Sequence, residues 1–159
     1  MTDFATVYDM FFRRIEKDKA FFLYIDTDKY ESMDLARERA RGLLDEAVGI
    51  ITAFCRPKVD FTAQSSDGFD EDLTPFEKLL ISSLMYQQYL EREIAYIKNL
   101  SRDYTSTDLR VFSPSDARTS FLSLFETVKK ECLNLMNEYV CTDRETGELI
   151  GVGYSSGEG

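Results

Sequence analysis

Four segments of the chain carry apolar residues at the three- and four-residue spacing of an α-helix. The most regular of them follows Thr74-Pro75-Phe76-Glu77 and continues to Leu100. Thr74 can accept a hydrogen bond from a free backbone amide, Pro75 suits the first helical position, and Glu77 can reach back to close a capping box. We therefore expect a helix over about residues 73–100, with its apolar stripe in the core of a bundle. The stripe consists of Leu79, Leu80, Leu84, Tyr86, Leu90, Ile94 and Ile97.

Three further helices are expected from the same spacing. The first covers Thr2 or Asp3 to Lys17 and has an aromatic face, whereas the second covers Ser32 to Phe54 and counts Phe54 among its apolar residues. The last follows Ser113-Pro114-Ser115-Asp116, which repeats the capping chemistry of the Thr74 segment, and its stripe runs from Ala117 to Tyr139. The short apolar run from Ala20 to Ile25 is compatible with a helix or with a strand.

The segments between these helices are polar and turn-prone, and residues 58–72 and 101–112 form the two longer loops. Beyond the last helix, residues 140–142 and 149–152 flank a polar turn that contains Gly147, so this part can form a short hairpin or simply extend. We predict an all-α fold: a small bundle of about four helices with long loops and an extended or hairpin C-terminal segment. Residues 1–140 then form the bundle domain, and residues 141–159 form the C-terminal segment and tail.

Composition places the chain among soluble globular proteins. Its 159 residues suffice for one domain with a core of its own, and 43% of them are hydrophobic whereas 30% are charged. No apolar run approaches the roughly 20 residues that span a bilayer, and the N-terminus lacks the cationic start of a signal peptide. We therefore expect a cytoplasmic protein without a membrane partner.

The chain is strongly acidic, because 29 Asp and Glu residues against 19 Lys and Arg residues give a net charge of −10. Such a charge repels phosphate backbones and argues against tight binding of nucleic acid. Solubility is the ordinary purpose of surface charge. An acidic surface can also line a passage through which DNA slides without sticking, or can mimic DNA for a basic partner.

The residue types give little support to catalytic chemistry. The chain has no histidine, which excludes Ser-His-Asp and Cys-His catalysis and His-ligated zinc. The three cysteines, Cys55, Cys132 and Cys141, form no C-x-x-C pair, so we expect reduced and mostly buried thiols.

Binding motifs for phosphate or metal are also missing from the sequence. No glycine-rich phosphate loop and no nucleophile elbow occurs. Asp67, Asp70 and Asp72 alternate around Gly68 as in a calcium loop, but the EF-hand spacing with its terminal Glu is absent. We therefore predict no enzymatic activity, no cofactor and no metal site.

Five stretches of the chain follow one another in a distinctive order over most of residues 4–140. They are the aromatic Val7-Tyr8-Asp9-Met10-Phe11-Phe12, the Leu43 to Phe54 helix that ends in Phe-Cys-Arg-Pro, the Leu73-Thr74-Pro75-Phe76-Glu77 helix start, the run from Leu84 to Ile94, and Phe112-Ser113-Pro114 before the Ala117 to Tyr139 helix. This order resembles the head–tail connector, or adaptor, proteins of tailed bacteriophages, especially those of long-tailed phages that infect Gram-positive hosts.

The resemblance implies a structural role and no enzymatic activity. Copies of such a protein form a ring, twelve-fold by this resemblance, beneath the capsid portal, where they extend the DNA channel and join head to tail. The implied partners are the portal protein, further neck or tail-completion proteins and other copies of the chain, while DNA passes through the channel without specific binding. The implied location is the neck of the virion, after synthesis in the host cytoplasm.

Candidate interface residues lie in the loops and the C-terminal segment, where apolar groups are expected to be poorly covered in a single subunit. They are Phe61, Phe69, Tyr104, Leu149, Ile150, Val152 and Tyr154. A rival hypothesis is a small acidic regulatory protein, such as an inhibitor that mimics DNA or binds a host protein. That protein should concentrate its carboxylates on one convex face.

Overall fold

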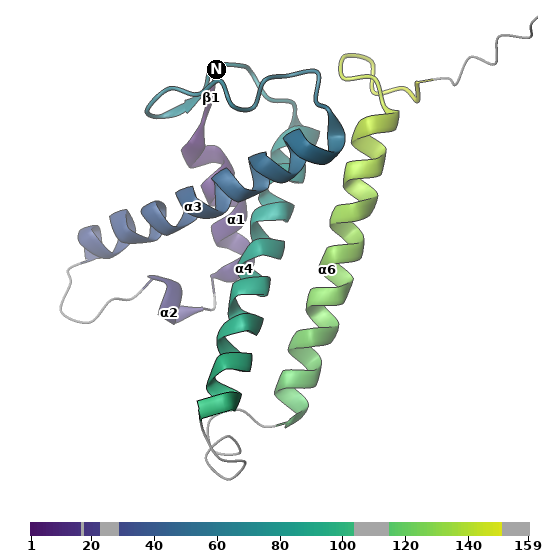
Figure 1. Cartoon of the computed structure of the whole chain (residues 1–159). Coiled ribbons are helices and arrows are strands. Elements are labelled where there is room, and N and C mark those ends of the chain that lie inside the picture. Colours follow the sequence, from purple (N-terminus) through teal and green to yellow (C-terminus); the bar gives the residue numbers. More distant parts are fainter. Residues whose placement is uncertain (17, 23–28, 104–114, 151–159) are drawn as a thin grey trace, which may run out of the picture.

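Helices make up most of the chain that the computed structural model describes, namely residues 1–16, 18–22, 29–103 and 115–150 (Figure 1). The helices are α1 (Phe4–Ile15), α2 (Lys19–Phe22), α3 (Lys29–Cys55), α4 (Pro75–Asp103) and α6 (Ser115–Cys141), and the two strands are β1 (Thr2–Asp3) and β2 (Gly68–Phe69). The predicted all-α class is confirmed, because the four long helices lie where the apolar spacing placed them.

The capping box predicted at Thr74 is present, whereas Ser113 and Pro114 of the second predicted capping motif lie outside the described residues. At the start of α4, the Thr74 amide donates to Glu77 Oε2 at 2.7 Å, and the Glu77 amide donates to Thr74 Oγ1 at 3.2 Å. This reciprocal pair is the capping box. At the start of α1, the Asp3 carboxylate accepts a hydrogen bond from the Ala5 amide at 2.8 Å. Local sequence therefore determines where these two helices begin.

Several boundaries differ from the expectation, since α1 ends at Ile15 and not at Lys17, and α4 continues to Asp103, into the predicted loop over residues 101–112. α3 begins at Lys29 and so includes three residues ahead of Ser32. The run from Ala20 to Ile25 was compatible with helix or strand, and its first residues belong to the short helix α2, while residues 23–25 lie outside the described part of the chain.

α4 is the central element of the bundle. It packs against α1 and α3 on one side and against α6 on the other. Figure 1 shows α6 running beside α4 in the opposite direction, and α3 crossing the pair so that its C-terminal end approaches α6. The loop after α3, the N-terminus and the C-terminal hairpin all lie at one end of the bundle (Figure 1). We call this end the hairpin end.

The core lies mainly between α4 and the N-terminal half of the chain. Six consecutive residues of α4, from Leu80 to Met85, are buried, so this part of the helix is covered on all sides. Most other buried apolar side chains come from α1, α3 and the loop that follows α3. Among the side chains that the structure describes in α6, two belong to the buried set, Val128 and Cys132. α6 is therefore the most peripheral of the long helices.

A two-stranded sheet, which the sequence did not predict, ties the N-terminus to the loop after α3. Thr2 pairs with Phe69 and Asp3 pairs with Gly68 in antiparallel register. A Cβ atom on Gly68 would lie 2.4 Å from the carbonyl oxygen of Thr2, so glycine is needed for the two strands to approach this closely. Strands of two residues show no alternation of apolar and polar positions, which explains why the pattern did not reveal them.

The expectation that Phe61 and Phe69 are poorly covered is wrong, since both rings are buried. Phe69 packs edge-on against Phe4 with ring centroids 5.1 Å apart, and Phe61 packs edge-on against Phe69 at 6.3 Å. The physical reason is the β1–β2 pairing, which folds the polar loop back over the start of α1 and places its two aromatic rings in the core. Neither ring offers surface to a partner in this structure.

Candidate interaction surface at the hairpin end

The centre of the hairpin end is a fully buried carboxylate, that of Glu77. Besides its capping bond, Glu77 Oε1 accepts hydrogen bonds from Arg144 Nε at 2.8 Å and from the Tyr139 hydroxyl at 3.3 Å. The second guanidinium nitrogen of Arg144 lies 3.3 Å from Glu77 Oε2. A buried charge is costly unless it is paired and hydrogen-bonded, and here every bond needed is present. Glu77 therefore joins the start of α4 to the end of α6 and to the hairpin beyond it.

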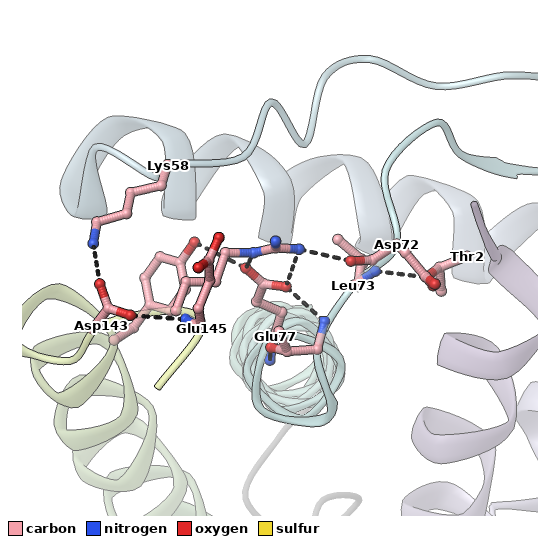
Figure 2. Close-up of polar contacts among 10 residues, drawn as sticks. Thr2, Lys58, Asp72, Leu73, Glu77, Asp143 and Glu145 are labelled. Carbon is pink, nitrogen blue, oxygen red and sulfur yellow. Dashed lines mark hydrogen bonds and ion pairs between the residues drawn. The ribbon is translucent and has the colours of Figure 1, made fainter. Parts of the chain in front are cut away.

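Arg144 extends this polar network to the N-terminus (Figure 2). Its guanidinium donates to the carbonyl oxygen of Asp72 at 2.6 Å. The hydroxyl of Thr2 in turn donates to the Asp72 carboxylate at 3.2 Å and accepts from the Leu73 amide at 2.8 Å. Burial and the Glu77 carboxylate raise the pKa of Tyr139 above its usual range. Segments from both ends of the chain are thus held by one set of contacts.

The C-terminal segment forms the hairpin that was one of its two predicted conformations. Thr142 pairs with Leu149 as an antiparallel bridge, and the Ile150 amide donates to the Cys141 carbonyl at 2.7 Å. The Asp143 carboxylate closes the turn by accepting from the Thr146 amide at 3.0 Å and the Glu145 amide at 2.9 Å. These backbone bonds hold the pKa of Asp143 down at about 2. Lys58 adds an ion pair to the same carboxylate at 3.4 Å.

The predicted interface residues of the hairpin are exposed. Leu149 is 78% exposed and Ile150 is 47% exposed. Tyr104, Val152 and Tyr154 lie outside the described residues. The structure therefore brings Leu149 and Ile150 together on the hairpin and removes Phe61 and Phe69 from the surface, while the role of the exposed pair in an interface stays a prediction.

A hollow of about 300 Å³ lies between the start of α4, the end of α6 and the turn of the hairpin. Pro75, Phe76 and Tyr139 contribute apolar surface to it, and the rings of Phe76 and Tyr139 are stacked with centroids 6.4 Å apart. Glu138 and Asp143 bring two carboxylates to the same hollow. The site therefore combines aromatic surface with two carboxylates and with the guanidinium of Arg144, which is paired with Glu77.

Further exposed carboxylates lie on the loop between α3 and α4. They are Asp60, Asp67, Asp70, Glu71 and Asp72. The hairpin end thus carries much of the negative charge that the composition showed. Among the described residues, no group of three or more His, Cys, Asp or Glu side chains could hold a metal ion.

Sequence reasoning placed two surface residues on apolar helix faces, namely Leu124 of α6, which is 41% exposed, and Phe54. Phe54 was counted among the apolar residues of α3, where helical spacing places it on the same side as Leu43 and Ala47. Leu43 and Ala47 are buried, but Phe54 is 76% exposed. Phe54 lies in the last turn of α3, which ends at Cys55. Helical periodicity predicts which face of a helix is buried, but it does not predict at which residue along the helix that burial ends.

The burial of the three cysteines agrees with the expectation of mostly buried thiols. Cys55 and Cys132 are buried and Cys141 is exposed, and all three are free thiols. Burial raises the pKa of Cys132 to about 11, so this thiol stays protonated at neutral pH and behaves as a small apolar side chain.

No helix in the described ranges is both long enough and apolar enough to cross a membrane.

Comparisons of the chain with protein-family models, with curated proteins and with solved structures found no match.

Proposed function

We propose that this chain is a structural subunit of the neck of a tailed bacteriophage, which forms a ring below the capsid portal, extends the DNA channel and joins head to tail. The order of its helices carries the resemblance to that family. The observation that carries the proposal is the surplus of apolar surface on the α6 side of the bundle. A ring subunit needs such surface, because each copy must cover part of its neighbour.

The surplus is found on α6 and on the hairpin that follows it. Leu122, Leu124, Leu133 and Val140 are exposed along α6, and Leu149 and Ile150 are exposed on the hairpin. Single exposed apolar residues are ordinary on a soluble protein, whereas a series along one helix and its extension is typical of an interaction surface. This distribution favours an assembling protein over an enzyme with a closed pocket.

The acidic loop supports a place beside a DNA channel. Its exposed carboxylates, for example Asp67 and Asp70, repel the phosphate backbone and would let DNA pass without sticking. In the proposed ring, the loop between α3 and α4 therefore faces the channel or its mouth.

The assembled state tests this proposal. The protein is mixed with the portal protein of the same phage, and the particles are imaged by electron microscopy. A ring of copies on the portal is the expected result. A chain that stays free of the portal at all mixing ratios, although the portal itself is intact, would contradict the proposal.

Deletion of Leu149–Gly159 tests whether this segment is needed for assembly on the portal and not for folding. We expect the helical bundle to stay intact, because the buried residues lie before this segment, while assembly on the portal weakens. A matched deletion of residues 151–159 alone keeps Leu149 and Ile150 and tells which part of the segment matters. Unfolding of the longer deletion would show that the hairpin belongs to the core.

A second candidate function is a small acidic inhibitor that mimics DNA, and the row of exposed carboxylates on the loop is the observation that favours it. Such a protein binds a basic DNA-binding partner at low salt and is displaced from it by DNA. Binding to the portal that does not depend on the loop carboxylates, together with no competition by DNA, would exclude this alternative.

A further inference from the structure

Phe54 and Arg56 form an apolar and basic projection at the end of α3. Phe54 is 76% exposed, and Arg56 is exposed two residues later. Arg56 has a φ of 46°, in the left-handed region that side chains other than glycine and asparagine rarely adopt. Pro57 follows and fixes the exit of the chain. A left-handed residue directly after the last helical residue is a common way for a helix to end, and here α3 ends at Cys55, directly after the exposed ring.

The hollow at the hairpin end has the complementary character. Its apolar surface comes from Pro75, Phe76 and Tyr139, and its volume of about 300 Å³ can accept an aromatic side chain. Glu138 is exposed and is not engaged in an ion pair among the described residues, whereas Asp143 is already paired with Lys58. The hollow is thus an aromatic socket with one available carboxylate. Phe54 of the same chain is exposed and does not line it.

We infer that Phe54 of one copy inserts into the hollow of a second copy, with Arg56 paired to Glu138 of that second copy. A phenyl ring gains from contact with the stacked pair of Phe76 and Tyr139 as well as from leaving water. The guanidinium and carboxylate add charge complementarity and fix the orientation. The inference rests on the proposed ring-forming function and names a contact between copies in addition to the exposed apolar surface of α6 and the hairpin.

In a ring the contact is heterologous, since each copy uses its projection toward one neighbour and its hollow toward the other. Every copy then offers one projection and one hollow, and repetition of the contact closes a ring when the rotation between copies allows it. A two-fold dimer in which two copies exchange projection for hollow would satisfy the same residue pairs, so self-association of the wild type that ends at a dimer would contradict the ring arrangement.

The first experiment measures self-association by analytical ultracentrifugation and counts the copies bound on the portal. Phe54→Ala should weaken the contact between copies by about 30-fold or more, as expected for the loss of a central aromatic anchor. Tyr96→Ala is the matched control, since Tyr96 is also an exposed aromatic residue on a long helix but lies on α4. It should leave association unchanged.

The second experiment tests whether one copy supplies the projection and the other supplies the hollow. Thr142 lines the hollow, so Thr142→Tyr should block it while leaving Phe54 intact. Each variant alone should be monomeric, but a mixture of Phe54→Ala and Thr142→Tyr should form dimers, because one brings a working hollow and the other a working projection. Arg56→Glu and Glu138→Lys should each weaken association, and the double variant should recover it.

The outcomes separate this inference from the proposed function. Rings of Phe54→Ala copies on the portal, equal to those of the wild type, would overturn the inference and leave the neck role standing. Loss of association with Phe54→Ala, recovery in the mixture and no binding to the portal would support the contact and contradict the neck role. A wild-type chain that stays monomeric at millimolar concentration, and whose portal binding is unaffected by Phe54→Ala, overturns the inference as well.

Discussion

The two sides of α4 are built differently. On one side, α1, α3 and the loop after α3 supply nearly all of the buried apolar residues that α4 does not supply itself. On the other side, α6 is as long as α3, with 27 residues in each helix, but adds two buried residues within its described side chains, Val128 and Cys132. The first side holds the fold together, whereas the second side is attached along one seam and keeps apolar surface on the outside.

This difference teaches that helix length and amphipathic pattern do not measure how much a helix contributes to stability. The sequences before α4 and α6 have the same pattern of a capping residue followed by proline, and the two helices have similar apolar stripes. Stability depends on apolar area removed from water. Fully buried apolar residues are numerous on α3 and α4, whereas the described side chains of α6 include two, with five more partly buried against the core. The apolar residues that α6 leaves uncovered are available for assembly.

The largest expected effect separates the two sides directly. Leu44 in α3 is fully buried, so Leu44→Ala should lower the free energy of unfolding by about 3–5 kcal/mol through lost burial and the cavity that remains. Leu133 in α6 is 53% exposed, so Leu133→Ala should change it by less than about 0.5 kcal/mol. Urea denaturation followed by circular dichroism measures both. Equal losses of unfolding free energy in the two variants would show that both sides of α4 contribute equally to stability.

Glu77 is the link between the two sides, and its removal should have the next largest effect. Glu77→Ala takes away the cap of α4 and leaves Arg144 without its carboxylate, and we expect a loss of about 3 kcal/mol. This value is at the low end for a buried pair because Arg144 is 26% exposed. Thr74→Ala, which removes the cap alone, should cost about 1 kcal/mol. Equal losses in the two variants would mean that the ion pair with Arg144 contributes nothing to stability.

The elements of the fold follow from local sequence, and this is why they could be predicted. Thr74 and Glu77 close their capping box within four residues, and the apolar spacing of α4 is complete within the helix itself. The β1–β2 pair could not be predicted, because it joins Thr2 to Phe69 across most of the N-terminal half. Its one local signal is Gly68, which is required by a contact that is distant in sequence.

The surface was harder to predict than the fold. Leu149 and Ile150 were expected to be exposed from their place beyond the last helix, and this prediction is confirmed. Phe61 and Phe69 were expected on the surface because their loop is polar, yet tertiary pairing buries them. Burial depends on which segments cover a residue, and loop composition carries no information on that.

Substitution of two glycines, one on each side of α4, compares the stability of the two sides at single positions. Gly68→Ala should destabilise the first side by about 2 kcal/mol, because the added Cβ would collide with the Thr2 backbone. Gly147 lies in the hairpin turn with a φ of 71° and open space around its Cβ position, so Gly147→Ala should cost about 1 kcal/mol from backbone strain alone. Hydrogen exchange should show the first loss across α1 and the second within the hairpin. Global loosening by Gly147→Ala would contradict the peripheral position of the second side.

The smallest expected effect is a local loosening of the hairpin at low pH. The amides of Thr146 and Glu145 donate to the ionised Asp143 carboxylate and hold its pKa at about 2. A free aspartate titrates at about 3.9, so the ionised form favours the hairpin fully above that pH, and the benefit is lost as the pH falls through about 2. Carbon chemical shifts of the Asp143 carboxyl group, followed by NMR between pH 5 and pH 1.5, measure the midpoint.

Asp60 is the matched position on the first side of α4, because its carboxylate accepts from the hydroxyl and the amide of Thr62 and its pKa is also lowered. Asp143→Asn removes the titration from the hairpin and should abolish the shift of the Thr146 amide near pH 2 without changing that of the Thr62 amide. Because Asp143 lies on the hairpin beyond α6, its protonation should leave the α1–α3–α4 core unchanged. A midpoint near 3.9 for Asp143 would show that its turn bonds do not persist in solution, and the second side would then be looser than the structure indicates.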